Sequence, residues 1–198
     1  MSETWPEIKK RKMRQRRSET FDWIQSVVMA LLVCVLLFTF CVRIIRVQGT
    51  SMLNTLHDGD RLIVSNLLYT PEQGDIIVLR KQTFSDYPIV KRVIATEGQT
   101  VDIDFEQGIV KVDGTALEED YVLEPINKRI DYTEPVVVPE GCVFVLGDNR
   151  NGSTDSRDDR IGCVDVRYIM GKAHFILLPG EDEDFKYGRE WRRMGSLE

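Results

Sequence analysis

The chain has 198 residues, 42% of them hydrophobic, which is enough for one domain of ordinary size with a buried core. Its net charge of −6 is unevenly spread, because residues 1–20 carry seven Lys or Arg against three acidic residues and the rest of the chain carries a net −10. An acidic body of this kind argues against binding to nucleic acid, so no nucleic-acid partner is expected.

The first predicted element is an apolar helix that follows the basic head. Residues 27–42 are apolar except for Thr39, and residues 21–42 together make a run of 22 residues. A helix of that length rises about 33 Å, close to the roughly 30 Å thickness of the hydrocarbon core of a bilayer. A cleaved secretory signal peptide is the alternative, but no small-x-small cleavage site follows, and Arg43 and Arg46 come next. Residues 21–42 are therefore predicted to form an uncleaved transmembrane helix.

The charges on the two sides of this helix predict its orientation. Lys and Arg are much denser in residues 1–20 than directly after the helix, and positively charged flanks stay in the cytoplasm. We therefore expect a single-pass protein of the plasma membrane, with residues 1–20 cytoplasmic and residues 43–180 outside. Membrane lipid is accordingly one predicted partner.

Beyond the helix the sequence predicts strands and turns. Short runs rich in β-branched residues occur at residues 61–66, 75–80, 89–96, 101–105, 108–114, 135–139, 142–148 and 172–178. Gly and Asp punctuate these runs, and no long amphipathic helix is present. Residues 43–180 are therefore predicted to be a mainly β domain of antiparallel sheets or a partly open barrel. The polar residues 115–134 are expected to form an extended excursion, and the charged residues 181–198 a solvated, loosely attached tail.

Two cysteines of the predicted outer domain, Cys142 and Cys163, leave two possibilities open. An oxidising compartment would permit a disulfide, but a separation of 21 residues does not determine their distance in space, and two free thiols are equally compatible. His57 and His174 stand alone, and no residues have metal-ligand spacing. Neither a metal nor any other cofactor is expected.

Ser51, in the segment GTSMLNTL, is a candidate nucleophile a short distance after the helix. A serine hydroxyl is a weak nucleophile unless a base removes its proton. His57 lies six residues further on in a turn and His174 lies in a predicted strand, and neither gives sequence support for a Ser-His-Asp arrangement. By itself, a serine in a glycine-containing loop is more often structural.

Lys91, in the segment YPIVKRVIA, is the other candidate base. A lysine amine has a pKa near 10.4 and must be desolvated to act as a base at neutral pH. Alternation along a strand puts Lys91 on one face with Ile89 and Val93, and Arg92 on the other face. The pattern does not decide which of the two cations faces the interior, and a strand lysine commonly reaches out to solvent.

A polar segment, GDNRNGSTDSRDDRIG at residues 147–162, follows an apolar strand. A hydrophilic surface loop is one alternative to a functional role, and a calcium site is another, since Asp and Asn side chains supply the oxygen ligands that calcium prefers. Three interleaved arginines argue against calcium, however, and the spacing is not that of an EF-hand. Short polar side chains at the end of a strand are well placed to build a hydrogen-bonded network around a site.

Together these three segments resemble the type I signal peptidases, which are membrane-anchored serine proteases. GTSMLNTL is similar to the nucleophile motif of that family, YPIVKRVIATEGQTV to its lysine motif, and GDNRNGSTDSR to its last motif, in the same order. The resemblance runs from the basic head to about Pro179, and the single-pass form is similar to the Gram-positive members. It implies an endopeptidase that removes signal peptides from exported preproteins through a Ser-Lys pair and an acyl-enzyme, without a cofactor.

The resemblance also implies a role for each matching residue. Ser51 matches the nucleophile, and its backbone N–H matches one oxyanion donor. Lys91 matches the general base, which returns its proton to the leaving amine. Gly49 stands where some members carry a hydroxyl as a second oxyanion donor. Asn54 stands where the family usually has proline, a residue that stiffens the loop but performs no chemistry.

The last motif of the resemblance implies a set of supporting residues. Six positions match, which are Asp148, Asn149, Arg150, Ser153, Asp155 and Arg157. The Ser153 hydroxyl matches the one that orients the lysine, and Asp155 and Arg157 match a supporting ion pair. The other three residues are expected to shape the loop.

Preproteins that bear signal peptides are the partners that the resemblance implies. Family substrates carry small residues at the −1 and −3 positions, which implies two shallow apolar pockets, and Met52, Ile89 and Val90 are candidates to line them. An extended substrate would bind through backbone hydrogen bonds. One alternative is an anchored, non-catalytic β domain that binds exported proteins. Another is a self-cleaving repressor of the same broader fold, against which the membrane helix argues. The sequence does not indicate an oligomeric state.

Overall fold

The computed structural model describes residues 19–36, 42–81, 84–85, 87–181 and 188–197. The chain divides into two compact units, Met1–Cys41 and Val42–Glu198, and each unit is described by itself. Most of the predicted basic head, residues 1–18, lies outside the described residues, as do residues 37–41 of the predicted helix.

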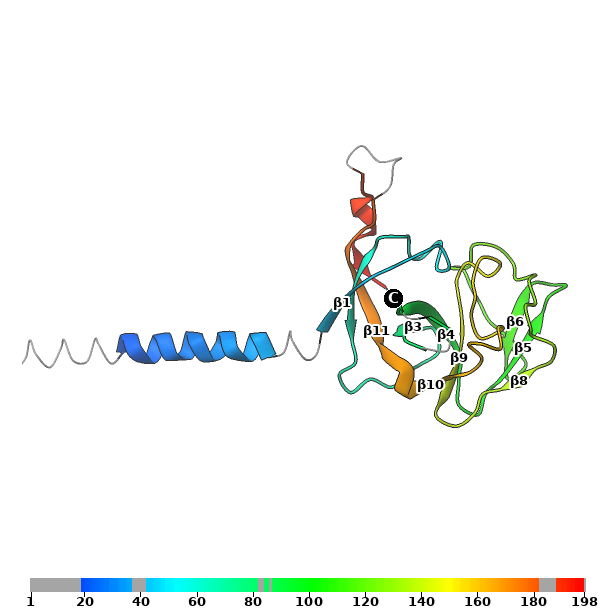
Figure 1. Cartoon of the computed structure of the whole chain (residues 1–198), viewed down its shortest axis with the longest axis horizontal. Helices are drawn as coiled ribbons and strands as arrows, with labels where there is room; N and C mark the ends of the chain where they lie inside the picture. Colours follow the sequence, from blue (N-terminus) through cyan, green and yellow to red (C-terminus); the bar gives the residue numbers. More distant parts are fainter. Residues whose placement is uncertain (1–18, 37–41, 82–83, 86, 182–187, 198) are drawn as a thin grey trace, which may run out of the picture. The chain divides into compact units, whose positions relative to one another are not determined.

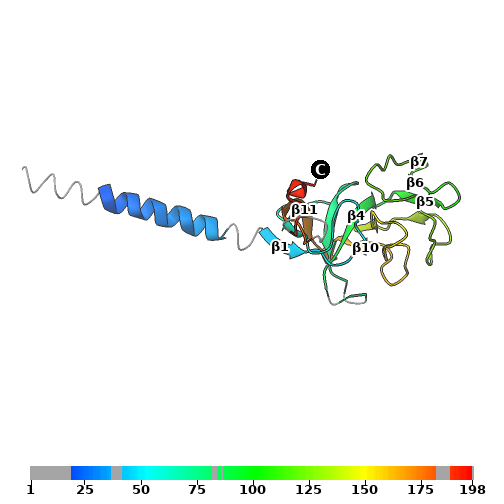
Figure 2. The same cartoon turned by 90° about the horizontal axis from the view of Figure 1, so that it is seen from above.

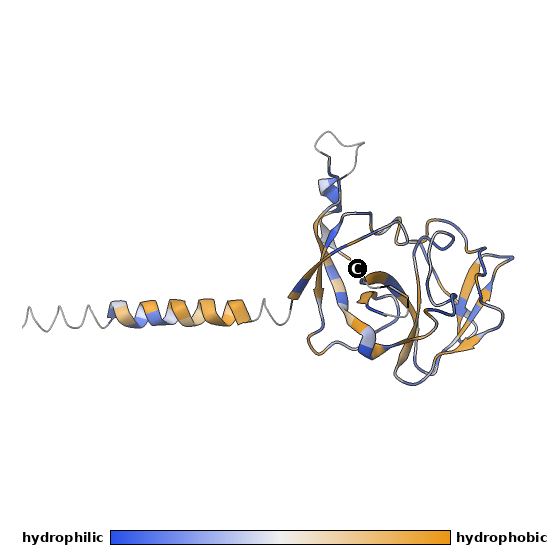
Figure 3. Ribbon diagram, viewed as in Figure 1, coloured by the Kyte–Doolittle hydropathy of each residue, from blue (hydrophilic) through white to orange (hydrophobic). Residues whose placement is uncertain are grey.

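In the first unit an α-helix runs from Glu19 to Leu36. Its 18 residues rise about 27 Å, and by length and composition the helix is able to cross a membrane. Its side chains are exposed throughout, and Figure 3 shows hydrophobic residues along most of it. Val42, the last residue of the predicted helix, is instead the first residue of strand β1, where it pairs with Ser65.

The second unit contains a curled antiparallel sheet, for which the described residues supply eight strands (Figure 1). Seven of these strands lie in the order β1-β2-β11-β3-β4-β9-β10, and β12 pairs with β11. Their bounds are β1 Val42–Arg46, β2 Arg61–Ser65, β3 Ile76–Leu79, β4 Ile89–Thr96, β9 Cys142–Leu146, β10 Val164–Asp165, β11 Ile169–Leu178 and β12 Gly195–Ser196. Two short 3-10 helices, Val166–Tyr168 and Trp191–Arg193, precede β11 and β12.

A smaller antiparallel sheet has the strand order β7-β6-β5-β8, and in two views its strands lie on the side of the domain away from β1 (Figures 1 and 2). Its strands are β5 Thr100–Asp104, β6 Ile109–Val112, β7 Thr115–Ala116 and β8 Val136–Val137. One hydrophobic cluster joins the two sheets, because Ile94 and Phe144 of the large sheet pack with Val101 and Val110 of the small one. This cluster holds the small sheet against β4 and β9.

The centre of the large sheet is covered on both faces. All four residues of β3 are buried, and alternate residues belong to two different hydrophobic clusters. Successive side chains of a strand point to opposite faces, so neither face of β3 meets water. Six consecutive residues of β4, the neighbouring strand, are also buried.

The predicted fold class, a mainly β domain of antiparallel sheets or a partly open barrel, is confirmed. Each of the eight predicted runs overlaps an observed strand. Strands β1, β7, β10 and β12 are additional to the prediction. Three of them have only two residues, and β1 carries two arginines in five residues, so their sequences give little strand signal.

Two polar segments are less exposed than their composition predicts. The excursion at residues 115–134 contributes Ile126 and Tyr132 to the cluster between the sheets. Residues 188–197 of the predicted tail are not loosely attached, because β12 pairs with β11 and Leu197 packs against a core cluster of the large sheet, although none of these residues is buried. Apolar and backbone contacts therefore hold segments whose charges suggested exposure.

Candidate active site

Ser51 lies in a compact connection between β1 and β2, the Ser51 turn (residues 49–60). The Gly49 N–H closes this turn by donating to Asp58 Oδ1 at 2.7 Å. The Met52 side chain, next to Ser51, is 1% exposed and packs into the core cluster that β2, β3 and β11 share. Ser51 itself is half-buried. The buried neighbour therefore holds the serine at the surface of the domain.

Lys91 reaches Ser51 from β4. Its Nζ lies 2.7 Å from Ser51 Oγ and donates a further hydrogen bond to the Val90 carbonyl at 2.9 Å. Lys91 is only 3% exposed. Burial lowers the pKa of Lys91 from its usual 10.5 to about 8, although the carboxylates of Asp155 and Asp148 act in the opposite direction. An amine with this pKa is partly neutral near physiological pH and is able to accept a proton from a hydroxyl.

Arg92, the residue after Lys91, is also buried, with 8% exposure. Its guanidinium donates two hydrogen bonds to the Asp148 carboxylate, from Nε at 2.9 Å and from Nη2 at 2.7 Å. Its Nη1 donates to the Gly74 carbonyl at 2.9 Å, and the guanidinium carbon lies 3.8 Å from the centre of the Tyr121 ring. Alternation did not decide which of Lys91 and Arg92 faces the interior. In the structure both are buried, Lys91 beside Ser51 and Arg92 beside Asp148.

The polar loop after β9 contacts the Ser51 turn through Asn149. The Asn149 N–H donates to the Ser51 carbonyl at 3.1 Å, and its side-chain Nδ2 donates to the Thr50 carbonyl at 3.1 Å. Arg150 turns the other way and donates two hydrogen bonds to the Glu119 carboxylate, at 2.6 and 2.8 Å. The loop thus connects the Ser51 turn to the polar excursion.

Asp155 and Arg157 form a fully buried ion pair in the same loop. Arg157 Nε lies 2.8 Å from Asp155 Oδ1 and Nη2 lies 2.9 Å from Oδ2, and both side chains are 0% exposed. The Gly147 N–H donates to Asp155 Oδ2 at 3.1 Å, and Arg157 Nη1 donates to the Lys128 carbonyl at 2.6 Å. The pair therefore holds the start of the loop, directly after β9, in place.

Ser153 does not make the contact that the resemblance implies. Its Oγ is buried and has no hydrogen-bond partner among the described residues, so it does not orient Lys91 in this structure. It lies against Gly147, where any added Cβ would clash both with Ser153 Oγ and with the Ser51 carbonyl oxygen. The glycine therefore leaves the space that lets the loop and the Ser51 turn approach each other.

The three candidates for lining substrate pockets differ in exposure. Met52 and Val90 are 1% and 7% exposed and belong to one core cluster. Ile89 is half-buried and packs against the cluster that contains Ile77 and Val93. Ile89 is thus the only one of the three that presents substantial surface here.

Three further residues that the motif analysis did not single out complete the network. Thr55 Oγ1 donates to Asp148 Oδ2 at 2.5 Å, and the Tyr121 hydroxyl donates to Glu119 at 2.8 Å. Glu119 and Tyr121 lie in the excursion, where no periodic pattern marks them. Thr55 belongs to the nucleophile motif, so its place in GTSMLNTL is the one signal that was available in the sequence.

The described part of the chain contains neither a cluster of metal ligands nor a disulfide. No group of three or more His, Cys, Asp or Glu side chains there is placed to hold a metal ion. Asp148, Asp155 and Asp158, three of the residues that suggested calcium, are each bound to an arginine instead. Cys142 and Cys163 are free thiols, which is one of the two possibilities that the sequence left open.

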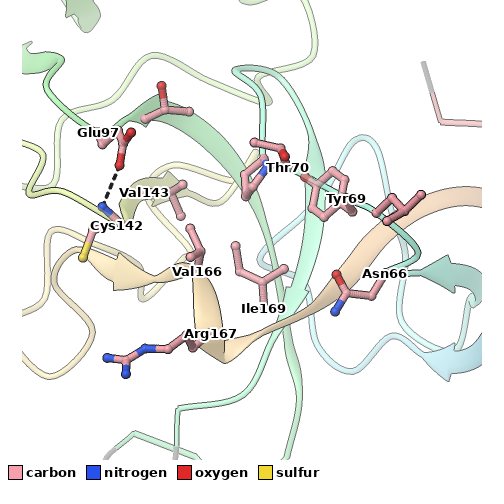
Figure 4. A pocket seen from close by; sticks show the side chains of 13 residues that line it. Asn66, Tyr69, Thr70, Glu97, Cys142, Val143, Val166, Arg167 and Ile169 are labelled. Atoms are coloured by element: carbon pink, nitrogen blue, oxygen red, sulfur yellow. Dashed lines mark hydrogen bonds between the residues drawn. The ribbon is translucent and has the colours of Figure 1, made fainter.

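A pocket of about 580 Å³ is formed at another part of the large sheet (Figure 4). Thr96 and Glu97, at the end of β4, are among its lining residues, and the Glu97 carboxylate accepts a hydrogen bond from the Gly141 N–H at 2.7 Å. Thr96 is five residues from Lys91, or about 17 Å along a strand. Ser51 and Lys91 do not line this pocket.

A serine hydroxyl beside a buried lysine amine is the arrangement of serine hydrolases that use lysine as their base. The profile of the family described as "Signal peptidase, peptidase S26" matches residues 20–178. The probable signal peptidase I-1 of Synechocystis sp. is 39% identical over 88% of this chain and 86% of its own length. Signal peptidase I of Bacillus licheniformis is 32% identical over 85% of this chain and 94% of its own length.

The chain therefore belongs to the signal peptidase family, peptidase S26, a family of peptide-bond hydrolases. The family membership that the three sequence motifs predict is confirmed, and the matched region contains all three of them. Among solved structures, a signal peptidase I from Enterococcus faecalis is 30% identical, with a TM-score of 0.42, and the match covers 52% of this chain and 97% of that one.

Proposed function

We propose that this protein is a membrane-anchored signal peptidase that cleaves signal peptides from exported preproteins, with Ser51 as nucleophile and Lys91 as general base. The observation that carries the proposal is the 2.7 Å distance between Ser51 Oγ and Nζ of a lysine that is 3% exposed. The relatives named signal peptidase I, at 39% and 32% identity over most of the chain, support the reaction class.

In the proposed reaction, neutral Lys91 takes the proton of the Ser51 hydroxyl while the hydroxyl oxygen attacks the scissile carbonyl carbon. The tetrahedral intermediate collapses as protonated Lys91 returns the proton to the leaving amine, and an ester remains on Ser51. Lys91 then deprotonates a water molecule, whose oxygen attacks the ester carbonyl, and Lys91 passes the proton to the departing Ser51 Oγ. The Ser51 N–H donates to no acceptor among the described residues, which supports a role as oxyanion donor. The Gly49 N–H is already used by Asp58.

The supporting residues are assigned from their contacts. We assign Asn149 to holding the Ser51 turn, and Asp155 with Arg157 to holding the start of the polar loop, because these are the groups that they bind. Ser153 receives no role from its contacts, because its buried hydroxyl has no hydrogen-bond partner among the described residues.

One edge of β4 supports the binding of an extended substrate. The first four residues of β4 pair with β3 on one side, whereas β9 pairs with β4 only from Arg92 onward. Among the described strands, none pairs with the other edge at Ile89–Lys91, beside Ser51. A signal peptide would add there as a strand, through backbone hydrogen bonds to β4.

The membrane location is part of the same proposal. The helix Glu19–Leu36 supports a single transmembrane span within residues 21–42, and the basic residues 1–20 support a cytoplasmic N-terminus. Residues 43–180 would then act outside the plasma membrane. Enzyme and signal peptide held in one bilayer meet at a raised effective concentration, which favours cleavage close to the membrane.

The pKa of Lys91 predicts the pH dependence of cleavage. A general base must be deprotonated, so kcat/KM is expected to rise about tenfold per pH unit below pH 8 and to level off above it. A profile from about pH 6 to about pH 10 checks this, with the folded fraction measured at each pH. A profile that stays flat through pH 8 would contradict Lys91 as the base.

The proposed function is tested with the full chain reconstituted into lipid vesicles. It is expected to cut a preprotein at one bond after a small residue, as read by N-terminal sequencing of the product. Acid quenching during turnover should trap an acyl group, and peptide mapping should place it on Ser51. Ser51→Ala should give neither product nor adduct.

Ser65 offers a matched control, because it is another serine with a basic partner. Its Oγ lies 2.9 Å from His174 Nε2. Ser65→Ala should retain cleavage and the adduct. An adduct on Ser65, or cleavage by Ser51→Ala at the wild-type rate, would overturn the assignment of the nucleophile.

A further inference from the structure

The C-terminal segment (residues 188–197) has a fixed place on the domain that carries Ser51. Strand β12 pairs with β11, and the Leu197 N–H donates to the His174 carbonyl at 3.0 Å. Leu197 also packs against the hydrophobic cluster that contains Met52. The segment is therefore attached next to the turn that bears the proposed nucleophile.

This attachment brings Arg193 to Asp60, the last residue of the Ser51 turn. Arg193 Nη2 lies 2.6 Å from Asp60 Oδ2, and Nη1 lies 3.1 Å from Oδ1. The Asp60 carboxylate is 0% exposed and also accepts the N–H groups of His57 at 2.8 Å and Gly180 at 2.7 Å. A buried carboxylate is costly unless it is paired and hydrogen-bonded, and Arg193 is the one cation paired with it among the described residues.

Arg193 contacts the Ser51 turn at a second point. Its Nη2 donates to the Thr55 carbonyl at 3.3 Å, and Thr55 Oγ1 donates to the Asp148 carboxylate at 2.5 Å. Asp148 is bound in turn by Arg92, the neighbour of Lys91. A continuous set of hydrogen bonds thus runs from the C-terminal segment, through the Ser51 turn, to the strand that carries the proposed base.

We propose that Arg193 is a positioning residue that sets the place of Ser51 relative to Lys91. It acts through Thr55 and Asp60, which lie four and nine residues after the serine, and it touches neither reacting group. The planar fork of an arginine is able to bind a carboxylate and a carbonyl together, which a single ammonium group does less well. The inference rests on the proposed function, because it assigns Arg193 a role in that reaction.

The test compares Arg193→Met, Arg193→Lys and Arg192→Met in the full chain, reconstituted in vesicles, with kcat and KM measured per folded enzyme. Methionine keeps an unbranched, flexible side chain and removes the guanidinium group with its charge. Arg193→Met is expected to lower kcat roughly ten- to hundredfold, since a shift of about 1 Å far from the chemistry has effects of this size. KM should stay within about twofold, because substrate contacts are unchanged. Arg193→Lys, which keeps the charge on Asp60, should fall between wild type and Arg193→Met.

Arg192 is the matched control, since it is exposed on the same 3-10 turn and no contact of its side chain is recorded among the described residues. Arg192→Met should match wild type. The proposal is overturned if folded Arg193→Met keeps the wild-type kcat. In that case any loss of activity per total enzyme would equal the fraction of the enzyme that is unfolded. Should Arg193→Met fail to fold, wild-type kcat in Arg193→Lys overturns it.

The same assay separates this proposal from the proposed function. Absence of cleavage by the wild type, or cleavage by Ser51→Ala, removes the proposed function itself. If the wild type cleaves, Ser51→Ala does not, and folded Arg193→Met cleaves as fast as wild type, then only the proposed role of Arg193 is contradicted.

Discussion

Replacing Lys91 by methionine is expected to lower kcat/KM for signal-peptide cleavage by at least about 10³-fold. The substitution removes the only amine within hydrogen-bond distance of Ser51 Oγ among the described residues. Methionine has a similar length and fills the same buried space, so the backbone of β4 should not move. The hydroxyl would then keep its proton at every accessible pH and remain a poor nucleophile.

The same substitution is expected to stabilise the protein. The pKa of Lys91 is 10.5 when unperturbed and about 8 in the fold, a difference that corresponds to about 3 kcal/mol against folding at neutral pH. The sign follows from proton binding, because between pH 8 and pH 10.5 the unfolded chain binds the proton that the folded chain has lost. The full penalty is therefore present below pH 8 and disappears as pH rises toward 10.5. Lys91→Met removes it at every pH.

Urea denaturation of the full chain at pH 7 and at about pH 10, beside the cleavage assay, measures both effects. The midpoint of Lys91→Met should exceed that of wild type clearly at pH 7 and only slightly at the higher pH. Lys111→Met is the matched control, since Lys111 is also a strand lysine but is partly exposed on β6. It should change neither activity nor the pH dependence of stability. A Lys91→Met variant that is less stable than wild type at pH 7 would contradict the desolvated amine.

The strands were predictable because their signal is local. Runs of β-branched residues bounded by Gly and Asp predict eight of the twelve strands that the described residues form, and each prediction requires only neighbours in sequence. The burial of both Lys91 and Arg92 was not predictable in the same way. Alternation assigns opposite faces to the two residues, but the coverage of both faces of the sheet depends on elements from distant parts of the chain.

The residues of the candidate site likewise fall into those that a local motif indicates and those that depend on contacts with distant parts of the chain. The motif resemblance indicated Ser51 and Lys91 as a pair, and the structure brings their side chains to 2.7 Å. Arg193 and Glu119 carry no comparable signal, because their partners lie 133 and 31 residues away in the sequence. A charged residue that finds a distant buried partner looks the same in sequence as one that is solvated. The prediction of a loose tail fails for that reason.

Replacing Asp155 by asparagine is expected to lower the free energy of unfolding by about 3–5 kcal/mol, because it leaves the Arg157 guanidinium buried without its counter-charge. Both side chains are 0% exposed, so water cannot solvate the arginine that remains. Removing both charges, in Asp155→Leu with Arg157→Met, should cost less than Asp155→Asn alone. Urea denaturation of the three proteins measures the order of stability.

The chain offers a matched control for this prediction. Asp165 and Arg167 repeat the same Asp-x-Arg spacing, with Arg167 Nη2 at 2.6 Å from Asp165 Oδ2, but the Arg167 side chain is 83% exposed. Asp165→Asn should leave the denaturation midpoint nearly unchanged, since solvent replaces the lost interaction. Equal shifts for Asp155→Asn and Asp165→Asn would show that burial does not set the strength of the first pair.

The pH profile of Asp155→Asn distinguishes an electrostatic effect on the site from a loss of packing. The Asp155 carboxylate raises the pKa of Lys91 and the Arg157 charge lowers it, whereas burial is the largest influence and lowers it. Without the Asp155 carboxylate, only Asp148 still opposes burial and Arg157, so the pKa of Lys91 should fall below about 8. The rise of kcat/KM should then move to lower pH even if the maximum rate declines. A loss of packing alone would reduce the rate at all pH values and leave the position of that rise unchanged.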